Sequence, residues 1–136
     1  MNSGGRNPAK DPKLEIEQLK LLFDYTKFHI GLYTTLATLV LTALGLKNKA
    51  GWDVAFIPWL MWISVLTLGV AGFAGGVIAG TIPQREGFSD FWDNETGPYR
   101  LKMLSGQAWT YVEHSSFWLA VIAAVLAFFL PAVGMG

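Results

Sequence analysis

The sequence predicts an all-α membrane protein with three transmembrane helices. Of its 136 residues, 52% are hydrophobic and only 15% are charged, against roughly 25% charged in an ordinary soluble domain. Charged residues are absent from three blocks that together cover more than half of the chain: 28–46, 54–84 and 115–136. An apolar run of about 18 residues or more can cross a bilayer as a helix. A soluble domain of this length cannot bury three such blocks, which excludes a soluble enzyme, a disulfide scaffold and a disordered chain.

The first predicted helix is partly cytoplasmic and partly transmembrane. Residues 1–11 mix glycine, proline and charge without a period, so we expect a flexible tail there. Asp11 and Pro12 mark a helix start, because Asp accepts from free amides and Pro at the first position gives up no hydrogen bond. An amphipathic stretch then runs uninterrupted into the first apolar block. We therefore predict one helix over 12–46, with its first half outside the bilayer.

The remaining segments follow from the other two blocks. A short polar turn leads to a second transmembrane helix over 54–82, in which Pro58 is tolerated in the first turn. Residues 83–114 form the one sizeable loop, where aromatic and acidic residues alternate in a pattern typical of interfacial helices. The third transmembrane helix spans 115–133 and has a helical lead-in on the loop side. Helices 1 and 3 are thus both expected to extend into the cytoplasm.

The basic residues predict the orientation of the spans, since Lys and Arg favour the cytoplasmic side of membrane helices. With three spans, the N-terminal segment and the 83–114 loop share one side, and only Lys47 and Lys49 lie on the other. The shared side carries the other eight basic residues, Arg6, Lys10, Lys13, Lys20, Lys27, Arg85, Arg100 and Lys102. We predict that the N-terminus is cytoplasmic and the C-terminus is outside.

Small residues in the second span predict close helix packing. Gly72, Gly76 and Gly80 recur at every fourth position, and Gly69 adds to the same region. Small residues on one face let two helix backbones approach within van der Waals contact. In the third span, Ala120 and Ala124 belong to a second small-residue face that is a candidate mate. Packing within the chain and packing between copies both remain open.

The first span carries a row of hydroxyl groups. Thr34, Thr38 and Thr42 are spaced by four residues, which places them on one helix face. Threonines in a membrane helix commonly bond back to a carbonyl of their own helix, and that is the structural interpretation. The functional interpretation is that these three residues line a narrow polar pore in an oligomer.

Two histidines, His29 and His114, fall at the cytoplasmic ends of their spans. A histidine pair can ligate haem iron or another metal, which makes both residues candidate ligands. A histidine at a headgroup boundary needs no partner, however, and the sequence supplies no further ligand set, so we predict no metal site and no cofactor. No ionisable residue falls deep inside any span, which argues against a proton- or ion-coupled transporter.

Enzyme motifs are absent from the sequence. The glycine-rich run GFAGGVIAG at 72–80 is apolar, and no Lys-Ser or Lys-Thr follows it as in a phosphate-binding loop. There is no cysteine, which removes thiol chemistry. Ten basic and ten acidic residues balance, so no net charge favours a nucleic acid duplex. The charged residues of the 83–114 loop form a candidate docking surface for a cytoplasmic protein or a nucleotide signal.

The layout of the first two spans resembles a known class of membrane protein. The amphipathic helix KLEIEQLKLLFDYTKFH (13–29) runs into span one, and the tight turn KNKAGWD (47–53) leads into span two. This arrangement resembles the SLATT-type small membrane effectors of bacterial defence systems. The resemblance implies an oligomer in the bacterial inner membrane that permeabilises it when a cytoplasmic sensor signals.

We therefore expect a non-enzymatic, multi-pass protein of the bacterial inner membrane that forms homo-oligomers and forms or gates a pore. Two alternatives remain open. The first is an accessory subunit that buries its glycine face against a larger membrane complex. The second is a haem-binding redox anchor that uses His29 and His114 as ligands.

Overall fold

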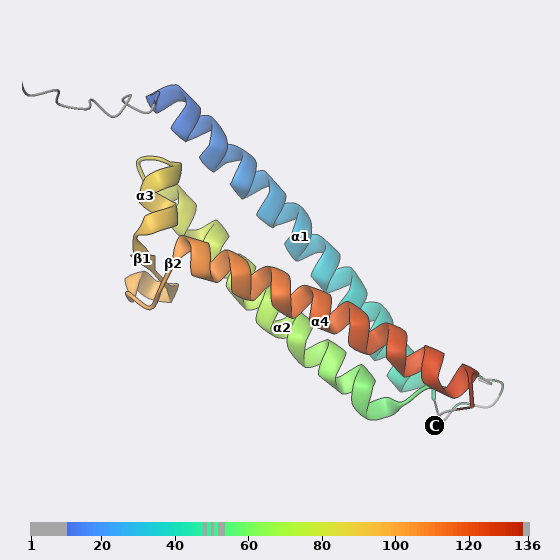
Figure 1. The fold of residues 1–136 in the computed structure, drawn as a ribbon. Coiled ribbons are helices and arrows are strands. Elements are labelled where there is room, and N and C mark those ends of the chain that lie inside the picture. The colour runs from blue at the N-terminus through green and yellow to red at the C-terminus, as the bar shows by residue number, and fades with distance from the viewer. Residues whose placement is uncertain (1–10, 48, 50, 52–53, 135–136) are drawn as a thin grey trace, which may run out of the picture.

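Three long helices lie side by side in the computed structural model (Figure 1). The structure describes residues 11–47, 49, 51 and 54–134, so residues 1–10 of the predicted tail and part of the 46–53 turn lie outside the described residues. The long helices are α1 (Pro12–Leu46), α2 (Pro58–Thr81) and α4 (Gly106–Ala132). Each is long and apolar enough to cross a membrane. The prediction of an all-helical chain with three candidate spans is confirmed.

Helix α1 packs through one narrow seam. The carboxylate of Asp11 accepts a hydrogen bond from the Lys13 amide at 3.0 Å, and this N-cap starts the helix as expected. Four of its buried residues recur at every seventh position, Leu19, Thr26, Tyr33 and Val40. A seven-residue period keeps one stripe facing a neighbouring helix, as in a coiled coil. The rest of α1 is largely uncovered.

Helix α2 lies against both other long helices and supplies more buried residues than any other element. Midway along the bundle, Leu68 and Ala71 of α2 pack with Tyr33 of α1 and Ala120 of α4. Towards the 47–57 connection, Met61 packs with Val40 and Ala127. Alanines on α4 therefore form the face that meets α2, because small side chains allow the two helices to approach closely.

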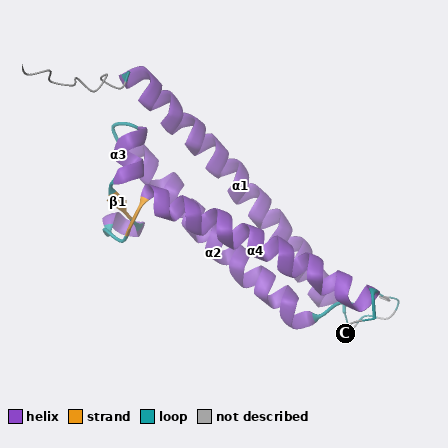
Figure 2. Ribbon diagram, in the orientation of Figure 1, coloured by secondary structure: helices purple, strands orange, loops and turns teal. Residues whose placement is uncertain are grey.

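The 83–114 segment is more ordered than a loop. It contains the 3-10 turns Ile82–Gln84 and Pro98–Arg100, the short helix α3 (Phe88–Asp93), and an antiparallel pair of two-residue strands, β1 (Glu95–Thr96) and β2 (Leu104–Ser105). Figure 2 shows these elements gathered at one end of the bundle, which we call the loop end. Helix α4 begins there, at Gly106, well before the third apolar block.

Three contacts fix the loop end to the long helices. Phe91 of α3 is fully buried against Gly106, where a Cβ atom would collide with the Phe91 backbone. The indole nitrogen of Trp109 donates to the Thr96 carbonyl at 2.9 Å, which ties β1 to α4. The Glu15 carboxylate of α1 accepts from the amide and hydroxyl of Ser89 at 2.7 and 2.9 Å. Glu15 thereby satisfies a free amide at the start of α3.

Candidate functional site

A buried group of polar side chains lies between α1 and α4 near the loop end, and we call it the polar centre. Tyr25, His29 and Tyr33 of α1 are spaced by four residues and share one helix face. Glu113 and His114 of α4 face them. The Glu113 side chain is only 1% exposed, although a buried carboxyl group is costly unless it is hydrogen-bonded.

The hydrogen bonds of the polar centre have a defined direction. The Tyr33 hydroxyl donates to Glu113 Oε1 at 2.9 Å. His114 Nδ1 lies 2.9 Å from the Thr110 carbonyl oxygen, which can only accept, so Nδ1 carries the proton. In the neutral ring, Nε2 then accepts from the Tyr25 hydroxyl at 3.0 Å. The polar centre thus holds two separate hydrogen-bonded groups, Tyr25 with His114 and Tyr33 with Glu113, and His114 Nδ1 lies 3.7 Å from Glu113 Oε2 between them.

His29 also belongs to the polar centre, but one of its ring nitrogen atoms lacks a hydrogen bond. Its Nδ1 atom is buried and has no hydrogen-bond partner among the described residues. The nearest acidic atom is Glu113 Oε1 at 3.9 Å, beyond hydrogen-bonding distance. An unmade hydrogen bond at a buried atom destabilises the fold. A buried polar atom without a partner can bind a proton, a water molecule or a ligand.

Gly75 brings the third helix to the polar centre. A Cβ atom at this position would lie 3.2 Å from Ile30 Cγ1 and 3.3 Å from Glu113 Oε1. Glycine therefore lets the α2 backbone approach the same carboxylate oxygen that accepts from Tyr33. The same helix carries Gly72, Gly76 and Gly80, yet the glycine that contacts another helix is Gly75.

The structure revises one inference from the sequence. Glu113 lies just outside the third uncharged block, and we expected no ionisable residue deep inside a span. In the fold it lies level with Tyr33 and Gly75, which both belong to uncharged blocks. Helix packing thus buries the Glu113 carboxyl group inside the bundle. The missed signal is the row of hydrogen-bonding aromatic residues, Tyr25, His29 and Tyr33, on the facing helix.

The two candidate ligands, His29 and His114, are brought together. Their ring centroids lie 5.7 Å apart, edge to face, and the Tyr25 ring lies 3.9 Å from that of His29. Residues 11–47 and 54–134, as described, contain no group of three or more His, Cys, Asp or Glu residues arranged to hold a metal ion. A haem between the histidines would require these packed rings to separate.

The glycine and alanine faces occupy different surroundings. Ala120 is buried and Ala124 half-buried, and both pack on α2 within the chain. Ideal Cβ atoms built at Gly69, Gly72, Gly76 and Gly80 meet nothing within 4 Å. The glycine face therefore takes no part in packing within the described chain. Packing between chains remains a prediction.

The threonine face is uncovered. Thr34, Thr38 and Thr42 are exposed, and each hydroxyl donates to the carbonyl four residues earlier, at 2.9, 2.8 and 2.7 Å. Such bonds satisfy the hydroxyl proton and allow the face to lie in lipid. The oxygen lone pairs stay available to accept a hydrogen bond. The structure thus shows the hydroxyl groups bonded back to carbonyls of their own helix, as the structural interpretation predicted. The pore-lining role remains a prediction.

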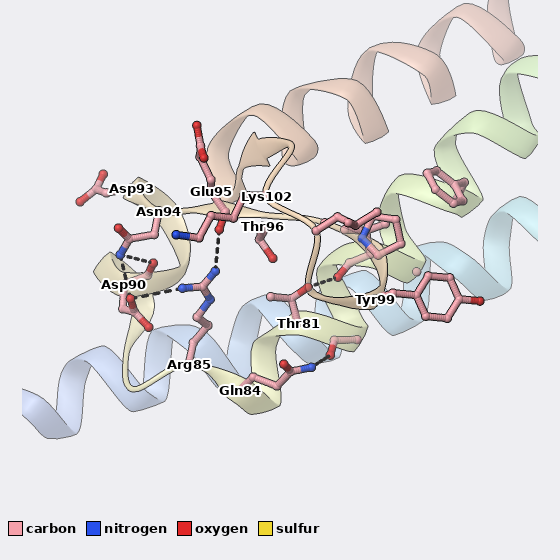
Figure 3. A pocket seen from close by; sticks show the side chains of 17 residues that line it. Thr81, Gln84, Arg85, Asp90, Asp93, Asn94, Glu95, Thr96, Tyr99 and Lys102 are labelled. Atoms are coloured by element: carbon pink, nitrogen blue, oxygen red, sulfur yellow. Dashed lines mark hydrogen bonds and ion pairs between the residues drawn. The ribbon is translucent and has the colours of Figure 1, made fainter.

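A cavity of about 1230 Å³ lies beside α2 at the loop end. Figure 3 shows Arg85 and Asp90 at one end of it and Tyr99 at the other, with Thr81 between. Its helical wall is apolar and includes Gly76 and Gly80. Five charged residues of the predicted docking surface thus line a hollow against a candidate membrane helix, namely Arg85, Asp90, Asp93, Glu95 and Lys102.

Comparisons with known proteins add no relative. No protein-family model, curated protein or solved structure matches this chain. Function is therefore argued from the geometry alone.

We predict that Glu113 and Tyr33 are energetically coupled. Glu113→Leu leaves the Tyr33 hydroxyl without an acceptor, whereas the double variant with Tyr33→Phe removes both partners and should lose less than the two single variants added together. The coupling should be about 1 kcal/mol, in the range measured between membrane helices. A double-mutant cycle on unfolding in detergent measures it, and Glu113→Gln is the acceptor-retaining control. Additive losses would show that the hydrogen bond contributes nothing.

Adding a large side chain at Gly75 and at Gly76 should have different effects on the stability of the chain. Gly75→Leu forces a side chain against Ile30 and Glu113 and should destabilise the chain by about 1–3 kcal/mol, as overpacking does. Gly76→Leu, one residue on, meets open space and should leave unfolding unchanged. Thermal unfolding of both variants in the same detergent is the measurement. Equal stability would contradict the assigned approach of α2 to the polar centre.

Proposed function

We propose that this protein is a small homo-oligomer that forms or gates a pore in the membrane. One observation carries the proposal: two small-residue faces on different helices are left uncovered by the chain. These are the glycines of α2, at Gly69 and Gly72 above all, and the threonines of α1 at Thr34, Thr38 and Thr42.

Uncovered small residues matter because lipid is as apolar as leucine. Helices in a bilayer associate through close packing and hydrogen bonds, and small residues mark the surfaces that do so. Within the chain, even the most covered candidate span is only 44% buried. A second copy of the chain gives the Gly69–Gly72 face the close contact that no part of its own chain supplies.

A path for ions fits between copies better than through one chain. Beyond the polar centre, the core is mostly apolar, with residues such as Leu68, Met61 and Ala127, and Ser64 is buried among them. Among the described residues, this single buried hydroxyl group does not continue a polar route from Glu113 along the middle of the bundle. In the proposed assembly α2 is the packing helix and α1 the lining helix, with the threonine oxygens facing the lumen.

The proposal includes an orientation and a setting. Eight of ten basic residues belong to the loop side, which supports a cytoplasmic loop end and an outer 47–57 connection. The resemblance to SLATT-type effectors adds the bacterial inner membrane and a cytoplasmic signal that opens the pore. The charged 83–114 segment is the surface at the cytoplasmic side that such a signal would meet.

Assembly is tested at Gly72. We expect the wild-type protein to run in detergent as a uniform multiple of 14.9 kDa. Gly72→Leu should shift it to the monomer, because added bulk separates the helices. Val70→Leu, which adds bulk at an exposed position on another side of α2, should keep the oligomer. A wild-type monomer that copurifies with other proteins would replace the pore with an accessory subunit.

Conduction is tested at Thr38. Thr38→Leu should reduce leakage from liposomes at least tenfold by narrowing and dewetting the lumen, while Thr38→Ser should leak like wild type. Ion and dye release at matched protein density is the measurement. A leaking wild type whose flux is unaltered in Thr38→Leu would move the path to another face. The oligomeric state of each variant is the control for assembly.

A further inference from the structure

The cavity beside α2 has the features of a lipid site. From its two unlike walls we infer that it binds a phospholipid whose headgroup carries both a phosphate and a primary amine. The inference does not depend on pore formation. It rests on the apolar wall, the polar wall and the mouth of the cavity, taken in turn.

The apolar wall is a groove along a membrane helix. Phe73, Gly76, Val77 and Gly80 recur at helical spacing on the side of α2 that faces the cavity. The two glycines contribute no side chain, and nothing lies within 4 Å of their ideal Cβ positions. A shallow channel of this kind accommodates an acyl chain, which replaces the missing side chains as packing partner.

The polar wall offers both signs of charge. Arg85 is already engaged, with Asp90 at 3.4 Å and with the Glu95 carbonyl at 3.0 Å. The side chains of Lys102, Asp93 and Glu95 make no hydrogen bond or ion pair within the part of the chain that the structure describes, and all three line the cavity. One ammonium and two carboxylates suit a phosphate and an amine on the same ligand, and they disfavour a purely anionic headgroup.

The mouth of the cavity is built for a membrane boundary. Tyr99 is 98% exposed and has a left-handed backbone (φ 55°), a conformation uncommon outside glycine. Leu101, also exposed, lines the cavity beside Tyr99. Tyrosine is enriched where headgroups meet hydrocarbon. The rim therefore faces lipid, and water-soluble ligands would leave these apolar side chains exposed.

The size of the cavity agrees with an amphiphile. At about 1230 Å³ it exceeds the roughly 300–1000 Å³ of most small-molecule pockets. A ligand with a headgroup at Lys102 and a chain along Gly76 and Gly80 uses both walls at once. A compact polar ligand would use only one of them.

The test is lipid retention by the intact protein. Wild type is purified from membranes with equal phosphatidylethanolamine, phosphatidylcholine and phosphatidylglycerol, and bound lipid is counted per chain by native mass spectrometry. We expect retained phosphatidylethanolamine to exceed each of the other lipids at least fivefold. Gly80→Leu fills the groove and should abolish this excess, while Gly69→Leu, on α2 outside the cavity, should keep it. Equal retention in the two variants would overturn the site.

The headgroup is tested separately. Asp93→Asn with Glu95→Gln removes the amine partners and should shift retention towards phosphatidylglycerol. Glycerophosphoethanolamine, which has the headgroup without acyl chains, should compete only weakly. Strong competition by it, or a wild-type preference for phosphatidylglycerol, would contradict an aminophospholipid. Oligomer size in Gly80→Leu should match wild type, whereas Gly72→Leu should lose the oligomer and keep the lipid, so failure of one proposal leaves the other standing.

Discussion

A single buried carboxyl group constrains how the three long helices meet. The side chain of Glu113 is only 1% exposed, and a buried carboxyl group is costly unless protein groups satisfy it. Tyr33 of α1 donates a hydrogen bond to Glu113, and the α2 backbone approaches the same carboxylate oxygen at Gly75. This arrangement requires a hydroxyl group at position 33 and the absence of a side chain at position 75. The crossing of α1, α2 and α4 near the loop end follows from these two requirements.

Towards the 47–57 connection the described core of the bundle is largely apolar, and Ser64 is its buried polar side chain. Apolar side chains fill the α2–α4 interface, and small alanines on α4 set its spacing. The loop end is held instead by directional contacts, in which Glu15 meets Ser89 and Trp109 meets Thr96. These contacts position the 83–105 segment over α2 and so create the cavity. Among the described residues, side-chain hydrogen bonds between elements thus gather at the loop end, whereas the other end is held by apolar packing and by a hydrogen bond from the Ile57 amide to the Ala127 carbonyl at 2.9 Å.

The class of fold was readable from the sequence, and the site was not. Three uncharged blocks predict three spanning helices because charge cannot be left in hydrocarbon, and Asp11 and Pro12 mark where α1 begins. Glu113 was missed as a site residue because the boundary of an uncharged block does not show how far a neighbouring helix extends beside it. The hairpin of β1 and β2 escaped prediction since each strand has only two residues. Gly75 was missed because the sequence argument considered only Gly72, Gly76 and Gly80, which recur at every fourth position.

The glycines of this run lie in two different surroundings in the folded chain. Gly76 and Gly80 lie in the cavity beneath the 85–102 segment, while Gly69 and Gly72 lie outside it. A neighbouring helix can approach the outer pair directly, but the loop stands between it and the inner pair. The glycine repeat of α2 is therefore divided into two pairs by the 85–102 segment, which folds back over one of them. The proposed helix packing and the proposed lipid binding therefore concern different pairs of glycines on one face of α2.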